Sequence, residues 1–268
     1  MSTSDIRDNY SRIATTYDGK WAGTLAIHAR AVSDRLPLAR ARRIAELGCG
    51  PGRVLPHLAQ LAPQARVIGS DLTEQMLRLA PARFDRVVAD AQRLPFRSGS
   101  LDAVVMAFVL FHLPDLPAGL SEVRRTLVPG GSFGAVTWSE FDPHPAYEVW
   151  VRVIDEHGAP PDPSPQMPSD NITSDPGKLR NALQEAGFET IEITGERFHH
   201  QTTAAEFLAH SEVVGAMARR IDELPAARRT ACLAAAEREL AGLAPEAFIE
   251  SGTVLYATAR AAKMGGWN

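Results

Sequence analysis

The chain has 268 residues, 45% of them hydrophobic and 22% charged, and a formal net charge of -4 at pH 7. This length and composition exclude a disordered chain and predict one large domain, or one domain with a substantial insertion. The mild negative charge argues against nucleic acid as a partner. The lack of a signal-peptide pattern or a membrane-length apolar run predicts a cytoplasmic protein with no membrane partner.

Short apolar strands alternate with helices along the middle of the chain. The predicted strands are 44–47, 66–70, 86–89, 101–107 and 133–138, and the predicted helices are 53–61, 73–80 and 117–127. Thr73 is expected to cap the second helix, and Pro129-Gly130-Gly131 to end the third. The strand at 101–107 is almost wholly apolar, as a sheet buried on both faces requires. This order predicts a parallel sheet with right-handed crossovers.

The alternation breaks after Trp138. Residues 139–175 are rich in Pro, Asp and Ser but contain an apolar helical face with Tyr147 and Trp150, so a lid is favoured over a linker. The remaining predicted elements are a helix at 176–186, a strand at 188–200, an Ala-rich helical block at 203–243 and a strand at 253–257. The helical block interrupts the sheet, and we expect it either to cover an active site or to pair two subunits.

Three closely spaced glycines follow the first strand. Gly48, Gly50 and Gly52 allow a backbone to approach a ligand closely, because glycine has no Cβ. Asp71 ends the second strand, about 20 residues on, where doubly wound sheets place a carboxylate for ribose hydroxyls. Asp90 ends the third strand. The pattern predicts an adenosine-type cofactor site at the carboxyl ends of parallel strands.

The glycine spacing argues against a dinucleotide. Sites for NAD usually carry G-x-G-x-x-G and bring the pyrophosphate to a helix N-terminus. Here the spacing is G-x-G-x-G, and Pro51 removes a backbone donor from the turn. A dehydrogenase is therefore disfavoured.

Five motifs lie in series: ELGCGPG at 46–52, GSDLTEQM at 69–76, DAQRLPF at 90–96, FVLFHLPD at 108–115 and LVPGG at 127–131. Together they resemble class I S-adenosylmethionine-dependent methyltransferases, most of all small-molecule enzymes of the ubiquinone/menaquinone and natural-product type. The resemblance runs from Asn9 to about Trp138 and is only architectural beyond it.

The resemblance implies an α/β fold with a doubly wound, mostly parallel seven-stranded sheet, the Rossmann-like methyltransferase fold, and a helical lid or cap. The expected divisions are an N-terminal helical cofactor cover at 1–35, the cofactor-binding core at 36–138, a lid insertion at 139–175, a core continuation at 176–202, a helical cap insertion at 203–247, and the last strand and tail at 248–268.

The implied cofactor is S-adenosyl-L-methionine, with S-adenosyl-L-homocysteine as product. The residues implied to contact it are Tyr10, Tyr17, Glu46, Gly48, Cys49, Gly50, Asp71, Leu72, Met76, Asp90, Ala91, Gln92 and Phe108. In this family Asp71 would hold the ribose hydroxyls, and Leu72 and Met76 would pack on adenine. Phe108 would sit beside the methionyl group, and Tyr17 would contact its carboxylate.

The acceptor side carries weaker signals. His112, His199 and His200 are candidate general bases, with His144 a further one, and a structural or solvated role stays open for each. Trp138, Tyr147 and Trp150 are candidate acceptor contacts, with core packing as the alternative. Cys49 is favoured as a small packing residue over a nucleophile. No metal site is expected, because Cys49 and Cys232 belong to no metal-spaced cluster.

The expected function is transfer of a methyl group to an O, N or C atom of a small-molecule acceptor by in-line displacement. Two alternatives stay open: a non-methylating reaction such as cyclisation or decarboxylation on the same cofactor-binding fold, and a non-catalytic binding protein. The expected partners are the small acceptor and, as one option, a second copy in a homodimer.

Overall fold

The computed structural model describes residues 2–20, 22–162, 167–212 and 215–263. Residues 1 and 21 of the expected cover, 163–166 of the lid, 213–214 of the cap and 264–268 of the tail lie outside the described residues. The chain forms two compact units. The core unit comprises Met1–Ser139, Met167–Glu196 and Val254–Asn268, and the helical unit comprises Glu140–Gln166 and Arg197–Thr253.

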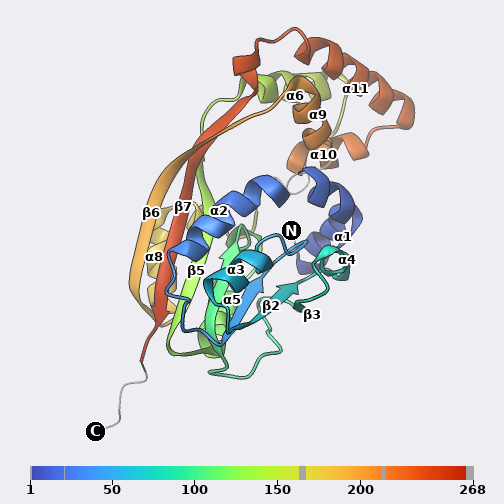
Figure 1. The fold of residues 1–268 in the computed structure, drawn as a ribbon. Coiled ribbons are helices and arrows are strands. Elements are labelled where there is room, and N and C mark those ends of the chain that lie inside the picture. The colour runs from blue at the N-terminus through green and yellow to red at the C-terminus, as the bar shows by residue number, and fades with distance from the viewer. Residues whose placement is uncertain (1, 21, 163–166, 213–214, 264–268) are drawn as a thin grey trace. The chain divides into compact units, whose positions relative to one another are not determined.

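One seven-stranded sheet has the order β3-β2-β1-β4-β5-β7-β6 (Figure 1). The strands are β1 (Arg43–Leu47), β2 (Arg66–Asp71), β3 (Asp85–Val88), β4 (Leu101–Ala107), β5 (Leu127–Phe141), β6 (Phe188–Gln201) and β7 (Ile249–Ala261). β1 pairs in parallel with β2 and β4, β2 with β3, and β4 with β5. β5 and β6 each begin in the core unit and end in the helical unit. β7 begins in the helical unit and ends in the core unit, so it runs antiparallel to β5 and β6. This mixed, mostly parallel sheet confirms the predicted fold class.

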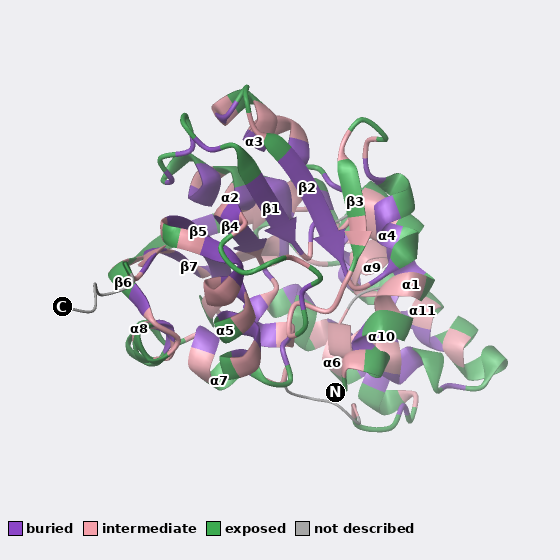
Figure 2. Ribbon diagram, turned by 90° about the horizontal axis from the view of Figure 1, so that it is seen from below, coloured by how far each residue is buried: buried purple, intermediate pink, exposed green. Residues whose placement is uncertain are grey.

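Helices pack against the strands of the core unit. They are α1 (Thr3–Lys20), α2 (Ala22–Asp34), α3 (Leu55–Leu61), α4 (Glu74–Leu79), η1 (Leu110–His112), α5 (Leu116–Thr126), α7 (Asp170–Thr173) and α8 (Pro176–Glu185). Leu120 of α5 and Leu183 of α8 share one apolar core with Val104. Ala103 and Val105 point to the other face of β4, where α2 packs, and both are fully buried. β1 and β2 are buried along most of their length, while β3 is an exposed edge strand (Figure 2).

Two local predictions were wrong. Thr73 occupies the residue before α4, but its hydroxyl donates to Asp71 rather than capping the helix. Pro129-Gly130-Gly131 does not end α5, because the helix stops at Thr126 and the three residues lie inside β5. There the β4–β5 register shifts, and Gly130 has φ 77°, which glycine tolerates.

The helical unit has an apolar core of its own. Its helices are α6 (Pro145–Glu156), α9 (Ala204–Ser211), α10 (Gly215–Asp222), α11 (Ala226–Leu240) and η2 (Pro245–Phe248). Trp150 of α6 shares this core with Phe207, Ile221 and Cys232. Segments that the sequence suggested as two insertions thus contribute to one core. The last part of the expected lid belongs instead to the core unit, where the Ser169 hydroxyl donates to the Leu113 carbonyl at 2.6 Å.

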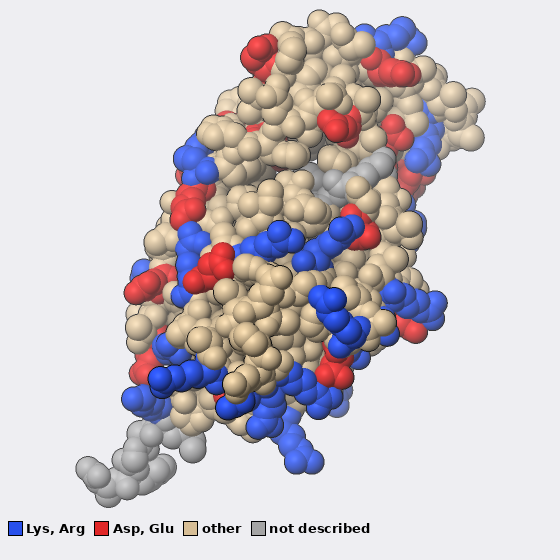
Figure 3. All heavy atoms as spheres, in the orientation of Figure 1, with Lys and Arg blue, Asp and Glu red and all other residues tan. Residues whose placement is uncertain are grey.

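Charged side chains of both signs lie close together on the face shown in Figure 3. Ion pairs join Arg66 to Asp85 at 2.5 Å and Arg53 to Asp18 at 2.7 Å. Exposed pairs of this kind contribute little to stability individually. None of the helices in the described ranges combines the length and apolar character that a membrane span requires.

Gly252 in β7 lies where a side chain does not fit. A Cβ there would lie 2.2 Å from the Glu140 carbonyl oxygen and 2.9 Å from the Phe198 ring. Gly252→Ala is therefore expected to lower the free energy of unfolding by about 1–3 kcal/mol, measured by urea denaturation. Gly242→Ala is the matched control, because its Cβ would lie 3.4 Å from its nearest neighbour. Equal losses of unfolding free energy in Gly252→Ala and Gly242→Ala would contradict the steric explanation.

Candidate functional site

The turn after β1 depends on glycine. Gly48, Gly50 and Gly52 have φ angles of 67°, 53° and 69°, in the left-handed region that residues with a Cβ rarely adopt. A Cβ on Gly48 would also lie 2.3 Å from a methyl carbon of Val109. At Gly48 and Gly50 the turn therefore offers backbone atoms without a Cβ to an approaching ligand.

The Asp71 carboxylate fixes this turn to the end of β2. One oxygen accepts from the Gly50 N–H at 2.8 Å, and the other accepts from the Thr73 N–H at 2.9 Å and hydroxyl at 3.0 Å. Burial raises the pKa of Asp71, and the hydrogen bonds from Thr73 and Gly50 oppose that rise. The carboxylate is therefore held in one orientation beside the cavity.

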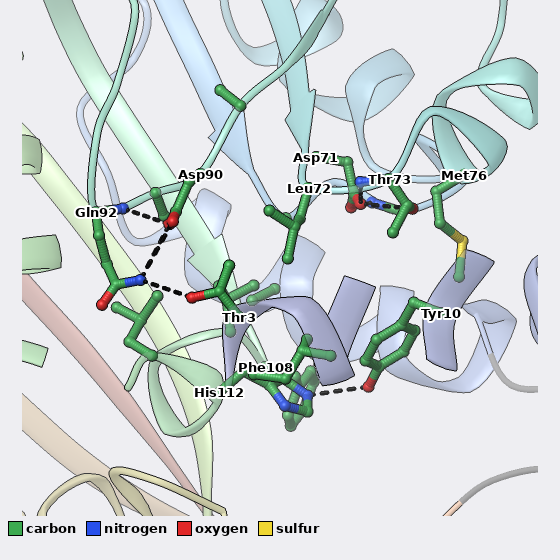
Figure 4. Close-up of a pocket in the computed structure, with 18 of the residues that line it drawn as sticks. Thr3, Tyr10, Asp71, Leu72, Thr73, Met76, Asp90, Gln92, Phe108 and His112 are labelled. Atoms are coloured by element: carbon green, nitrogen blue, oxygen red, sulfur yellow. Dashed lines mark hydrogen bonds between the residues drawn. The ribbon is translucent and has the colours of Figure 1, made fainter. Parts of the chain in front are cut away.

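A cavity lies at the carboxyl ends of β1, β2 and β4. The predicted cofactor residues that line it are Tyr10, Tyr17, Gly48, Gly50, Asp71, Leu72, Met76, Asp90, Ala91, Gln92 and Phe108. Figure 4 shows Asp71 and Asp90 on neighbouring strand ends, with Leu72 and Met76 nearby. Among the described residues that line this cavity there is no Lys or Arg.

A second cavity shares Tyr17, Gly48, Gly50 and Phe108 with the first. The second cavity is also lined by Glu46, Cys49 and Arg53, so the predicted contact residues missing from the first cavity occur here. Because the two share a border, they can hold two halves of one extended ligand.

Glu46 is a buried acid with an unused acceptor. It is 3% exposed, and its Oε2 has no hydrogen-bond partner. Burial, and to a lesser degree the charge of Asp71, raise the pKa of Glu46 to about 8. Buried polar atoms usually have partners. A cationic ligand group in the second cavity would supply the missing partner.

Phe108 lies where the two cavities meet. It directly follows β4 and has φ 57°, a strained angle for a residue other than glycine. Its N–H donates to the Val136 carbonyl at 2.8 Å, and its ring centroid lies 4.4 Å from that of Trp138. Trp138, a predicted acceptor contact, thus borders a residue of the candidate cofactor site.

Tyr10 and His112 form the polar pair of the first cavity. The Tyr10 hydroxyl lies 2.9 Å from His112 Nε2, as Figure 4 shows, and both side chains line the cavity. The Tyr10 ring also meets the Tyr17 ring edge to face at 5.7 Å. Burial raises the pKa of Tyr17 well above its ordinary value, so its hydroxyl stays neutral. The structure brings His112, alone among the predicted bases, into the wall of this cavity.

Two further links hold α1 beside the cavities. Gln92 Nε2 donates to the Thr3 hydroxyl at 3.3 Å and to both carboxylate oxygens of Asp90 (Figure 4). At the other end of α1, Arg53 Nε donates to Asp18 at 2.7 Å. The helix that the sequence suggested as a cofactor cover is therefore attached near both ends.

The other candidates belong to the helical unit. His199 and His200 lie on β6, and Tyr147 is 43% exposed on α6. Trp150 is fully buried in the core of that unit, which favours packing. His144 Nδ1 accepts from the Tyr147 N–H and so caps α6. Contact of His199, His200, Tyr147 or Trp150 with an acceptor stays a prediction.

Several wall residues were not predicted. They are Thr3, Ile6, Thr73, Val109, Leu113, Pro114 and Arg53. Thr73 could have been found from its position two residues after Asp71, where Asx turns form. Arg53 directly follows the glycine turn, and Val109, Leu113 and Pro114 lie inside the FVLFHLPD motif.

Comparisons with known proteins give one family. A family model described as a methyltransferase domain matches residues 45–135. The chain is 34% identical over 158 residues to demethylmenaquinone methyltransferase of Thermus thermophilus, across 54% of this chain and 70% of that protein. It is 38% identical over 99 residues to the enzyme of the same name from Deinococcus radiodurans, across 34% of this chain but only 40% of that protein.

A solved structure shares the fold. Haemonchus contortus phosphoethanolamine N-methyltransferase 2, in complex with phosphomonomethylethanolamine and S-adenosylhomocysteine, is similar with a TM-score of 0.57 and 17% identity. The similarity covers 98% of this chain and 61% of that chain. At this identity the likeness concerns the fold.

Proposed function

Because this chain belongs to the class I S-adenosylmethionine-dependent methyltransferases, we propose that it transfers a methyl group from S-adenosylmethionine to an O, N or C atom of a small-molecule acceptor. The observation that carries the proposal is the pair of adjoining cavities. The first offers acids and apolar side chains suited to adenosine, and the second offers an unpartnered carboxyl group suited to an ammonium.

Each half of the cofactor has matching residues. Asp71 is placed to accept from ribose hydroxyls, and Asp90 from the adenine amino group. Leu72 and Met76 provide an apolar wall for the flat face of adenine. Glu46, with its free Oε2, suits the amino group of the methionyl half. When bound, S-adenosylmethionine supplies a methyl group already activated by the sulfonium.

The chain's own contribution is alignment, exclusion of water and handling of a proton. Phe108, Val109 and Leu113 give the first cavity an apolar stretch of wall, which excludes water. Alignment of an acceptor within about 3–3.5 Å of the methyl group lowers the barrier by several kcal/mol. We propose His112 Nε2, which lies 2.9 Å from the Tyr10 hydroxyl, as the atom that takes up the proton of an acceptor that must lose one.

The first cavity favours an acceptor without negative charge. Asp71 and Asp90 belong to the adenosine half of the proposed site. The rest of the described lining, which includes Tyr10 and His112, has no Lys or Arg to pair with an anion. An uncharged, partly apolar acceptor agrees with the quinone-pathway names of the two relatives. Membership of the methyl-transferring class EC 2.1.1, a role in natural-product synthesis, a cytoplasmic location and a homodimer stay predictions of the same proposal.

The proposal is tested by following both products. Purified protein is incubated with S-adenosylmethionine carrying a labelled methyl group and a panel of small phenols, quinols and amines. We expect label in one acceptor and an equal amount of S-adenosylhomocysteine. Conversion of an acceptor without consumption of the cofactor would instead identify a non-methylating reaction.

Glu46 gives the binding reaction a pH signature. With a pKa of about 8, Glu46 is mostly protonated at pH 7 in the free protein. An ammonium beside it favours the carboxylate, so binding of S-adenosylmethionine is expected to release up to about one proton at pH 7. The release should diminish above pH 8, where the free protein has already lost that proton. The number of protons released is measured by calorimetric titration in two buffers of different ionisation enthalpy.

Glu46→Gln is the control for this prediction. The amide keeps the size of the protonated acid but cannot release a proton. The variant should therefore bind with no buffer-dependent heat and with lower affinity. Proton release that persists in Glu46→Gln would assign it to another group.

A further inference from the structure

A polar pair beside Phe108 joins α2 to β7. His28 Nδ1 lies 2.7 Å from the Tyr256 hydroxyl, a hydrogen bond that bridges 228 positions of the chain. All the residues of this pair and its neighbours belong to the core unit. Neither His28 nor Tyr256 is among the residues found to line the two cavities.

The His28 ring supports the wall of the cofactor site. It meets the Phe108 ring at 6.0 Å and an interplanar angle of 79°, and the Trp138 ring at 6.5 Å and 71°. Both are edge-to-face arrangements, which aromatic rings prefer. Since Trp138 packs on Phe108 at 4.4 Å, His28 contacts both members of that pair.

Tyr256 is itself fixed from its other side. It is 4% exposed, and the Arg35 guanidinium lies 3.9 Å from the centre of its ring. Arg35 in turn pairs with Glu196. One chain of contacts therefore leads from the surface carboxylate of Glu196 through Arg35, Tyr256 and His28 to Phe108.

The pair is neutral near pH 7. Burial lowers the pKa of His28, with Glu196 acting in the opposite direction. Burial and the charge of Glu196 raise the pKa of Tyr256, which Arg35 opposes. A neutral imidazole and a neutral phenol form a directional hydrogen bond without the cost of a buried charge.

Phe108 needs such support. Its φ of 57° costs free energy, and residues keep strained angles only where the surrounding structure imposes them. Phe108 is also the aromatic side chain, together with Tyr17, that borders both cavities. A change in its position would alter the junction that the methionyl half must cross.

We propose that the hydrogen-bonded pair of His28 and Tyr256 is a positioning device that holds Phe108 in its left-handed conformation and so sets the affinity for the methionyl half of the cofactor. This inference rests on the cofactor site proposed above. Neither residue of the pair touches the cofactor; both act through Phe108.

The test separates the two halves of the ligand. His28→Phe keeps an aromatic ring but removes Nδ1, and Tyr256→Phe removes only the hydroxyl. Each variant is expected to weaken binding of S-adenosylmethionine about 5–10-fold, while binding of adenosine changes less than about twofold. Both changes remove the same hydrogen bond. The double variant should therefore bind S-adenosylmethionine with about the affinity of whichever single variant binds it less tightly. Calorimetric titration gives all of these constants.

His57→Phe is the matched control. His57 Nε2 also makes a polar contact, to Asp34 at 2.7 Å, but on α3 and outside the residues found to line the cavities. This variant should bind both ligands as the wild type does.

Three outcomes would overturn the inference. Unchanged binding of S-adenosylmethionine by His28→Phe and Tyr256→Phe would refute it while leaving the cofactor site intact. Equal losses for S-adenosylmethionine and adenosine would show general disruption instead of positioning. A folded wild-type protein that binds adenosine but not S-adenosylmethionine would overturn the proposed function, and this inference with it.

Discussion

Asp71→Ala is expected to weaken the binding of S-adenosylmethionine by about 100-fold or more. The substitution removes a charged acceptor for ribose hydroxyls, and hydrogen bonds to charged groups contribute about 1.5–3 kcal/mol each. It also leaves the Gly50 and Thr73 N–H groups without their present acceptor, so the glycine turn loses its tie to β2. Calorimetric titration measures the loss directly.

The fold of this variant should persist. Burial raises the pKa of Asp71, which means that the charged form carries a desolvation cost in the free protein. Removal of the carboxylate relieves that cost, which partly offsets the loss of the hydrogen bonds. We therefore expect the midpoint of thermal unfolding of Asp71→Ala to be close to that of the wild type. Asp85→Ala, which removes an exposed carboxylate from β3, is the control and should bind normally. Binding within about threefold of wild type in Asp71→Ala would contradict the assigned role.

His112→Phe is expected to reduce kcat about 10²–10⁴-fold for an acceptor that must lose a proton, with cofactor affinity nearly unchanged. The phenyl ring preserves the aromatic contact with Tyr10 but cannot accept a proton. Tyr10→Phe removes only the partner hydroxyl and should reduce kcat less. Initial rates between pH 5 and 9, with the acceptor found by the labelled-methyl screen, measure both variants.

The pH profile separates chemistry from structure. If His112 accepts the proton, the wild-type rate falls at acid pH and the residual rate of His112→Phe loses that limb. His57→Phe provides a histidine control outside the described cavity walls. A variant that keeps kcat but loses cofactor affinity would show that His112 instead orients the loop before Pro114.

The core of the site could be predicted because its signals are local in the sequence. Gly48 directly follows β1, Asp71 is the last residue of β2, and Asp90 lies two residues after β3. The carboxyl ends of parallel strands meet at one edge of a sheet. The order of these residues along the chain was therefore enough to predict that they lie close together, without knowledge of how side chains pack. The motifs also placed Phe108 and His112 in the segment that follows β4, although nothing in them predicted the strained φ angle of Phe108.

Features that depend on distant packing could not be predicted. The helical unit joins α6 to helices that begin about 50 residues later, and Ala-rich segments carry little pattern that specifies which faces meet. The same holds for His28 and Tyr256, which are 228 positions apart. Thr73 shows that local hydrogen bonds compete. Its hydroxyl could either cap α4 or donate to the Asp71 carboxylate, and in the structure it donates to Asp71.

The attachments of α1 have a consequence for the order of folding. This helix is synthesised before β1 to β4, yet its polar links reach Arg53, Gln92 and His112. It can dock only after β1 to β4 have assembled, because those partners lie between or just after these strands.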